Sequence, residues 1–279
     1  YADSSSEPTI RGGVIGNNGG HGNYLNGSSA TIDSVEIRDN GEHGIYCNSS
    51  SPSITDNTIS GNTYPIGVTG VLGFTALSGN TISGNDYDTA IAISGNVSGT
   101  IYNAIHLDAG LNAYVVTSNI TVPSGDTLTI EPSAIVKFDR NRRITVQGTL
   151  TADGVSGREI IFTSLADDEY GGDTNGDGAS SGSPGDWYYI YPYGDTSDGS
   201  LLNYCIIRYG QYGIYCSNSN LTISNCTIEE SSHDGIYADS SSEPTIRGGV
   251  VRNNARDGIR LNGSPAGINI DSVEIRDNS

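Results

Sequence analysis

A step of about 22 residues recurs along the first third of the chain, and it limits the fold more than any other feature. Isoleucines separated by this step form two columns, Ile10, Ile32 and Ile54, and then Ile15, Ile37, Ile59 and, one residue further on, Ile82. An asparagine follows each member of the second column by three residues, giving Asn18, Asn40, Asn62 and Asn85. The same spacing returns late in the chain at Ile207, Ile228, Val251 and Ile275, and at Asn254 and Asn278.

A repeat of this length with short alternating bursts is typical of one coil of a β-solenoid. Helical repeats of similar period need amphipathic runs of about a dozen residues, and the sequence has none. In the burst Ser-Val-Glu-Ile, alternation sends Val35 and Ile37 inward and Ser34 and Glu36 outward. Stacked coils would bury aliphatic columns, and a repeated corner asparagine would hydrogen-bond its neighbours above and below.

This pattern resembles that of right-handed parallel β-helix repeat proteins, the superfamily that also contains pectate lyases. The resemblance covers nearly the whole chain and is sharpest over residues 114–208. There YVVTSNITVPSGDTLTIEPSAIVKF, GTLTADG, IIFTSLADDEYGGDTNGDG and PGDWYYI are similar to a module of long, multi-unit bacterial and archaeal surface proteins. The resemblance implies an exported chain of tandem units. We therefore expect an all-β fold, a right-handed parallel β-helix (β-solenoid) with coils of about 22–24 residues.

The chain also repeats on a longer scale. YADSSSEPTIRGGV occupies residues 1–14 and 237–250, and IDSVEIRDN occupies residues 32–40 and 270–278. The offset of 237 − 1 = 236 residues corresponds to roughly nine or ten coils. Neither end has the atypical capping coil that solenoids need. The predicted organisation is one continuous solenoid, in which residues 1–102 complete one repeat unit and residues 103–279 form the next. The second unit is expected to have a strand-rich start (114–162), an acidic insertion (166–186) and further coils (187–279).

Charge and sequons indicate the setting and the partners. The net charge of −19 argues against nucleic acid and anionic membrane surfaces, because both would repel the chain. No stretch has the apolar length that crosses a bilayer, and no signal peptide precedes Tyr1, so we expect no membrane insertion. Asn-x-Ser/Thr sequons fit an extracellular or cell-surface glycoprotein. The glycosylation candidates are Asn26, Asn48, Asn96, Asn119, Asn220 and Asn262, with a seventh sequon at Asn225.

The segment with the most potential metal ligands is DDEYGGDTNGDG, residues 167–178. Asp and Asn alternate there as in calcium loops, and Gly178 permits a tight turn. An EF-hand does not fit, because Pro184 stands at the twelfth position, where a bidentate Glu is required. A looser calcium loop and a merely solvated acidic insertion are the two interpretations. Calcium is thus the one cofactor expected, with candidate ligands Asp167, Asp168, Glu169, Asp173, Asn175 and Asp177.

Two of the four cysteines are candidates for a disulfide. Cys205 and Cys226 each precede an inward isoleucine by two residues, so they should stack on adjacent coils and face the core. The coil spacing of about 4.8 Å falls within the Cα separation that a disulfide tolerates. A bridge and two reduced, buried thiols are both open. Cys47 and Cys216 are expected to be small core residues.

Two groups of basic residues could serve in binding, but a purely structural role explains each of them as well. The segment KFDRNRR, residues 137–143, contains the only lysine, Lys137, which could neutralise a uronate carboxylate. A strand, a turn and a strand with a salt-bridged edge explain the segment better. His21 and His43 lie one coil apart and could hold a metal or respond to pH, but a solvated turn position is the preferred interpretation.

Tyr24 over Tyr46, and Tyr215 over Tyr237, form outward stacks that could receive sugar rings or a neighbouring subunit. The preferred function is a non-enzymatic structural protein, a unit of an extracellular β-solenoid fibre, filament or adhesive stalk. Its partners would be copies of itself, by end-to-end stacking or tandem continuation. The alternative is a secreted carbohydrate-binding or polysaccharide-degrading (lyase- or hydrolase-like) β-helix. No catalytic residue is assigned, since such an enzyme needs carboxylates gathered on one exposed face.

Overall fold

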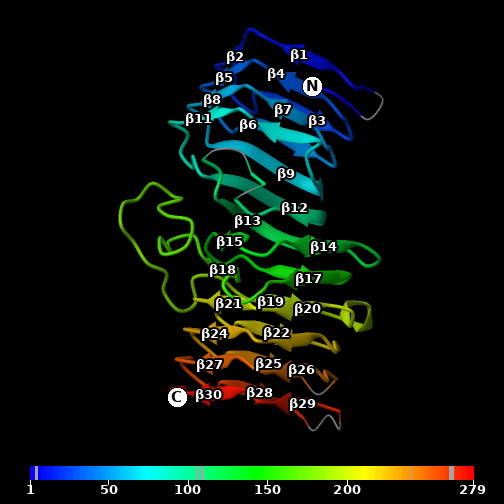
Figure 1. Cartoon of the computed structure of the whole chain (residues 1–279), viewed down its shortest axis with the longest axis vertical. Helices are drawn as coiled ribbons and strands as arrows, with labels where there is room; N and C mark the ends of the chain where they lie inside the picture. The colour runs from blue at the N-terminus through cyan, green and yellow to red at the C-terminus, as the bar shows by residue number, and fades with distance from the viewer. Residues whose placement is uncertain (4–5, 105, 108–109, 240, 264–266) are drawn as a thin grey trace.

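Short strands stack in parallel, coil upon coil, along one long axis that runs from the N-terminal to the C-terminal end (Figure 1). The computed structural model describes residues 1–3, 6–104, 106–107, 110–239, 241–263 and 267–279. Within each column, a strand pairs in parallel with the strands of the neighbouring coils, as in β-solenoids, and the strand that ends a column pairs on one side. The predicted all-β parallel solenoid is therefore confirmed.

Three columns of strands form the N-terminal half. The first column contains β1 (Thr9–Arg11), β4 (Thr31–Asp33), β7 (Ser53–Thr55) and β10 (Ala76–Ser78). The second contains β2 (Val14–Gly16), β5 (Glu36–Arg38), β8 (Thr58–Ser60) and β11 (Thr81–Ile82). The third contains β3 (Asn23–Asn26), β6 (His43–Asn48), β9 (Tyr64–Leu72), β12 (Ala90–Ile101) and β13 (Ala113–Val122).

Three columns also form the C-terminal half. One contains β14 (Thr127–Ile130), β17 (Thr149–Asp153), β20 (Leu201–Asn203), β23 (Thr222–Ser224), β26 (Thr245–Arg247) and β29 (Asn269–Asp271). The next contains β15 (Ile135–Phe138), β18 (Ile160–Ser164), β21 (Cys205–Arg208), β24 (Thr227–Glu229), β27 (Val250–Arg252) and β30 (Glu274–Arg276). The last contains β16 (Ile144–Val146), β19 (Ile190–Pro192), β22 (Ile214–Cys216), β25 (Ile236–Ala238) and β28 (Ile259–Leu261). A single 3-10 turn, η1, covers Asp195–Ser197. No helix among these residues has the length and apolar character needed to span a membrane.

The predicted columns are confirmed residue by residue. Ile10 pairs with Ile32, which pairs with Ile54, and Ile15 pairs with Ile37 in the second column. The corner asparagines hydrogen-bond as expected, because each side-chain amide donates to the side-chain oxygen of the asparagine in the next coil. These N···O distances are 2.8 Å for Asn18–Asn40, 2.9 Å for Asn40–Asn62, 2.9 Å for Asn62–Asn85 and 2.8 Å for Asn254–Asn278.

The two halves meet in β12 and β13, and the columns change partners there. β6 carries Gly-Ile-Tyr-Cys and stacks through β9, β12 and β13 onto β15. β22 carries Ile-Tyr-Cys, directly preceded by Gly213, but stacks through β19 onto β16. The register of β12 shifts between Ile93 and Gly95, where Gly95 has a φ of 72° that favours glycine. Equivalent repeat positions therefore lie in different columns in the two halves.

The core is a continuous column of inward side chains that runs from Ala2 to Val251. Its largest aromatic contact is Phe138 against Trp187, with ring centroids 4.1 Å apart. The indole nitrogen of Trp187 donates to the carbonyl of Arg208 over 2.9 Å, so this buried N–H is satisfied. The acidic insertion leaves the solenoid after β18, projects from its left side in Figure 1 and returns just before Trp187. Trp187 thus anchors the chain where it re-enters the core.

Candidate functional site

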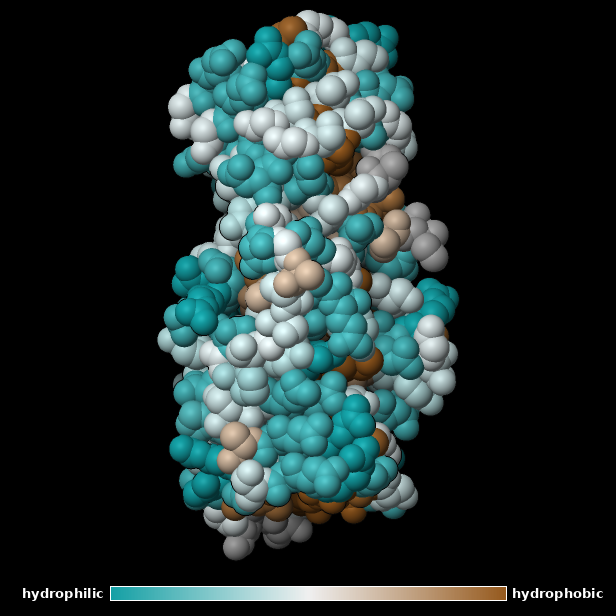
Figure 2. Space-filling view, turned by 90° about the vertical axis from the view of Figure 1, so that its left-hand side faces the viewer, coloured by the Kyte–Doolittle hydropathy of each residue, from teal (hydrophilic) through white to brown (hydrophobic). Residues whose placement is uncertain are grey.

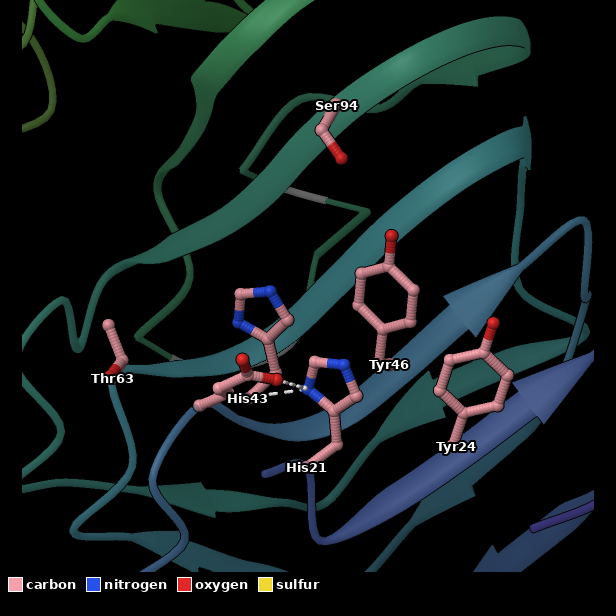
Figure 3. Close-up of a pocket in the computed structure, with 7 residues that line it drawn as sticks. His21, Tyr24, His43, Tyr46, Thr63 and Ser94 are labelled. Carbon is pink, nitrogen blue, oxygen red and sulfur yellow. Dashed lines mark hydrogen bonds and ion pairs between the residues drawn. The ribbon is translucent and has the colours of Figure 1, made fainter. Parts of the chain in front are cut away.

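A groove of about 480 Å³ lies on the outer surface of the N-terminal coils (Figure 3). Strand alternation creates it, because Leu25 and Cys47 point into the core and so turn Tyr24 and Tyr46 outward. Successive coils contribute residues at equivalent repeat positions to the groove, and β12 borders the groove on one side. The lining residues are His21, Tyr24, Glu42, His43, Tyr46, Thr63 and Ser94.

The rings of this groove stack along the solenoid axis. His21 lies 4.5 Å from Tyr46 and 5.1 Å from His43 between ring centroids, with interplanar angles of 6° and 7°. Tyr24 pairs with Tyr46 in the strand register, which confirms the predicted stack. Rings stacked in this way cover one another's faces, so they turn polar edges toward the groove. The nearest charge is Glu42, whose Oε2 lies 3.1 Å from Nδ1 of His21.

The two histidines differ from the solvated turn residues that the sequence predicts. Burial, followed by the charge of His21, lowers the pKa of His43 to about 4. Burial also lowers the pKa of His21, while Glu42 opposes that shift. Nδ1 of His43 is buried and has no hydrogen-bond partner among the residues described. Both imidazoles are therefore neutral at physiological pH, and protonation of His43 is costly.

Acidification is expected to destabilise the folded chain through His43. The unfolded imidazole binds a proton below about pH 6.5, whereas the folded one binds it only near a pKa of about 4. The neutral His43 thus contributes to the free energy of unfolding in full above the pKa of the unfolded imidazole. This contribution is lost as the pH falls toward the pKa of the folded imidazole, and the loss is about 2 kcal/mol at pH 5. Urea unfolding at about pH 7 and pH 5 measures the loss. His43→Tyr is the control variant, because tyrosine is the residue at the matching repeat position, Tyr212. In this variant the loss of stability caused by His43 should vanish. An equal loss of stability in the variant and the wild type would contradict the prediction.

The acidic insertion covers the outer face of β15, and a buried lysine meets its charge. Val136 and Phe138 face the core, so alternation points Lys137 outward, yet it is fully buried because the insertion lies over it. Nζ of Lys137 donates to the carbonyl of Gly172 over 2.7 Å. Burial lowers the pKa of Lys137 to about 8, against the opposing charges of Asp168 and other carboxylates. The strand, turn and strand are present as predicted, with edge ion pairs between Arg140 and Asp186 and between Arg142 and Asp139, whereas Lys137 is buried and donates to a backbone carbonyl.

Arg208 in β21 binds the start of the insertion. Its Nη1 donates to Oε2 of Glu169 over 2.6 Å, and its Nε lies 3.8 Å from Oδ2 of Asp167. Asp167 is 1% exposed and also accepts a hydrogen bond from Thr163. Glu229 approaches the same guanidinium at 3.9 Å. Asp167 and Glu169, which the sequence suggests as calcium ligands, thus bind a cation of the protein itself.

Three of the suggested calcium ligands converge. Carboxylate oxygens of Asp168, Asp173 and Asp177 lie within 4.8 Å of one another in the described part of the chain. Oδ1 of Asp168 is buried without a hydrogen-bond partner there. Asn175 instead donates its side-chain amide to Oδ2 of Asp177 over 2.7 Å. Calcium binding stays a prediction, now centred on three carboxylates beside the Lys137 ammonium.

The sequon asparagines differ in how free their side-chain nitrogen is, which is the atom that a glycan modifies. Asn96 in β12 and Asn119 in β13 are exposed. Asn26 accepts a hydrogen bond through its oxygen. Four others use the nitrogen as a hydrogen-bond donor, namely Asn48, Asn220, Asn225 and Asn262. Glycosylation stays a prediction, with Asn96 and Asn119 the most accessible acceptors.

All four cysteines are buried free thiols. Cys205 and Cys226 lie on adjacent coils as predicted, because the next inward residues, Ile207 and Ile228, are paired. The two thiols are unbridged in this structure, and the disulfide stays a prediction. Burial, followed by the hydrogen bond with Cys226, raises the pKa of the Cys205 thiol and so disfavours the reactive thiolate. Cys47 and Cys216 are core residues, as expected.

A second aromatic surface lies on β19, β22 and β25. Tyr215 stacks on Tyr237 as predicted, with ring centroids 4.6 Å apart. The surface extends well beyond this pair, because neighbouring tyrosines continue the ring contacts in both directions along and across the coils. We call it the tyrosine face and define it as Tyr189, Tyr191, Tyr193, Tyr212, Tyr215 and Tyr237.

The stacked coils and their asparagine columns define a parallel β-solenoid protein. A family model described as the right-handed β-helix region matches residues 1–106 and 188–279. The chain belongs to this right-handed β-helix family, which includes pectate-lyase-like enzymes as well as non-enzymes. No curated protein and no solved structure matches the chain.

Proposed function

We propose that the chain is a non-enzymatic structural segment of an extracellular or cell-surface β-solenoid, which lengthens when further coils stack on its ends. The C-terminal coil carries the main support. Ile270 and Ile275 are inward residues by register, yet they are 43% and 50% exposed. Their partners one coil inside, Ile246 and Val251, are each 2% exposed. Figure 2 shows apolar atoms gathered at this lower end, whereas the side of the solenoid is largely hydrophilic.

A covered copy of the same coil occurs inside the chain. Residues 32–40 and 270–278 have the identical sequence IDSVEIRDN. In the first copy, strands of the preceding and following coils flank Ile32 and Ile37, and both residues are 0% exposed. The terminal coil therefore has the residues of a coil that is buried on both sides. Covering it would remove apolar surface from water and pair the free edges of its strands.

The opposite end offers a matching surface. Ile10 and Ile15 are only partly buried there, although they continue the columns of Ile32 and Ile37. The outward ladder of the first column ends in Arg11, whose side chain is 72% exposed, and the equivalent ladder at the other end finishes in an aspartate, Asp271. Head-to-tail stacking would bring these charges together and keep all strands parallel. Such a contact is heterologous and does not close, which is the geometry of a filament.

Oligomerisation of the purified chain tests this proposal. Sedimentation velocity over a range of concentrations, with electron microscopy, should show end-to-end oligomers. Ile275→Lys should abolish them, because a charge would be buried in the contact. Val155→Lys is the matched control: Val155 is 43% exposed away from the ends, so this variant should assemble normally. A wild-type chain that stays monomeric would overturn stacking between separate chains, and one that cleaves a polysaccharide would overturn the structural role.

A further inference from the structure

We infer that the tyrosine face is a binding platform for an uncharged polysaccharide. Alternation in three successive strands builds it, because Ile190, Ile214 and Ile236 are 0% exposed and face the core. The residue after each isoleucine therefore points outward, and in all three strands it is a tyrosine. These tyrosines span two coil steps, about 10 Å along the axis. The platform is thus long enough to contact successive rings of a linear sugar chain.

Several rings of the tyrosine face meet edge to face, whereas Tyr215 and Tyr237 are stacked with an interplanar angle of 29°. The interplanar angles are 77° for Tyr191 and Tyr215, 90° for Tyr212 and Tyr215, and 63° for Tyr212 and Tyr237. Edge-to-face neighbours cannot cover both faces of every ring, so apolar ring faces and phenol hydroxyls occur side by side on this surface. A pyranose has the complementary design, with C–H groups on its faces and hydroxyls around its rim. An aromatic surface with a few polar groups suits such a ligand.

Charge favours an uncharged ligand over an acidic polymer or a second copy of the chain. The protein carries a net charge of −19, so a polyanion meets long-range repulsion, and so does a copy aligned side by side along the whole solenoid. Two cations at the tyrosine face already have partners: Arg143 lies 5.9 Å and 5.8 Å from the ring centroids of Tyr189 and Tyr191, and Arg260, the register partner of Tyr237, lies 3.9 Å from Asp257. Arg143 is the one in contact with the rings. It also donates a hydrogen bond to the Tyr189 hydroxyl over 3.3 Å. Arg143 thereby holds the rings in place.

The phenols of Tyr212 and Tyr215 remain hydrogen-bond donors at any physiological pH, because both pKa values are raised. Burial, followed by the charges of Tyr237 and Tyr191, raises the pKa of Tyr215 to about 12. Burial and the charge of Asp234 raise the pKa of Tyr212 as well, while Arg256 and Arg260 oppose that shift. Tyr212 and Tyr215 can therefore offer their faces to sugar C–H groups and their hydroxyls to sugar oxygens. Binding of this kind needs no metal and cleaves no bond.

Affinity electrophoresis of the full chain tests the inference. Separate gels contain hydroxyethylcellulose, laminarin, galactomannan or dextran, with polygalacturonate as the acidic comparison. The Ile275→Lys background is used so that stacking of the ends does not alter migration. At least one neutral polymer should retard the protein, and Tyr215→Ala should weaken binding about 10-fold. Tyr215→Phe, which keeps the ring, should bind more tightly than Tyr215→Ala.

Tyr46→Ala is the matched control, since it removes an equivalent outward tyrosine from the stacked rings of the N-terminal groove and should leave binding unchanged. Tyr193 is 47% exposed at the margin of the face, so Tyr193→Ala removes a ring without disturbing the core. Its binding should fall whether or not Tyr215→Ala folds.

Absence of retardation by all four neutral polymers, stronger retardation by polygalacturonate, or equal losses in Tyr46→Ala and Tyr193→Ala would each overturn the inference. A changed sedimentation coefficient of Tyr193→Ala in the wild-type background would assign the face to contacts between copies instead. Binding is measured on a chain with one end blocked, so failure here leaves the proposal of end-to-end stacking untouched.

Discussion

Arg208→Met should lower the free energy of unfolding by about 3–5 kcal/mol, the cost of breaking a buried ion cluster from one side. Methionine keeps much of the volume but leaves Asp167, which is 1% exposed, without its counter-ion. Glu229 loses one partner and keeps Arg252 at 2.8 Å, so the uncompensated charge is mainly that of Asp167. The guanidinium also lies 4.4 Å from the ring centroid of Tyr209, and this contact disappears too. Urea unfolding monitored by far-UV circular dichroism measures the change.

Arg276→Met is the matched control for this prediction. Arg276 forms ion pairs of 2.6 Å with Glu274 and with Asp277, as short as the closest pair of Arg208, but its side chain is 41% exposed. Solvent screens such pairs, so the loss of unfolding free energy should be much smaller than that of Arg208→Met. Adding Asp167→Asn to Arg208→Met should restore part of the stability, because the buried charge is removed. Equal losses at Arg208 and Arg276 would show that burial of the cluster has no energetic role.

Asn62→Ala should cost about 3 kcal/mol of folding stability, because it interrupts the asparagine column in its middle. Asn62 is 2% exposed, and its oxygen accepts from both the backbone N–H and the side-chain amide of Asn40, over 3.2 Å and 2.9 Å. Its own amide donates to Asn85 and to the carbonyl of Ser60, each over 2.9 Å. Alanine replaces none of these bonds and leaves donors of the buried Asn40 unsatisfied.

Asn112→Ala is the control for the asparagine column. Asn112 is exposed, so its replacement should change stability by no more than about 0.5 kcal/mol. Thermal unfolding of both variants and the wild type compares them under one condition. Hydrogen exchange adds a local measurement, because amides of the coils next to Asn62 should lose protection before those near the C-terminal end. A small, uniform effect of Asn62→Ala would mean that water replaces the missing amide without cost.

Most of the fold follows from periodicity. A coil closes after about 22 residues, so residues one period apart must stack, and the inward position of each burst is set by alternation. Ile32, Ile37 and Asn40 could therefore be placed before any coordinates were known. The tyrosine face was within reach as well, because YYIYPY at residues 188–193 alternates tyrosine with inward residues. Only the stacked pair Tyr215 and Tyr237 was predicted, since the inclination of rings depends on packing between coils.

The charged insertion shows where periodicity ends. Lys137 and Gly172 are separated by 35 residues, and Arg208 and Glu169 by 39, and neither separation is related to the coil period. An irregular loop can fold over any face of the solenoid, so its sequence does not reveal which cations it will meet. Lys137 and Arg208, the two buried cations, therefore change how the acidic residues of the insertion are interpreted. Some of the expected metal ligands, among them Asp167, bind the protein itself.

Local sequence thus determines the coil, its inward columns and its corner asparagines, because each depends on contacts one period apart. The relative placement of the two halves is a different matter. Both β6 and β22 contain Ile-Tyr-Cys preceded by a glycine, yet they belong to different columns because the long strands β12 and β13 each run across more than one column. Only the tertiary structure shows this, since a shift of register in β12 re-routes every later coil while leaving the repeat within each half unchanged.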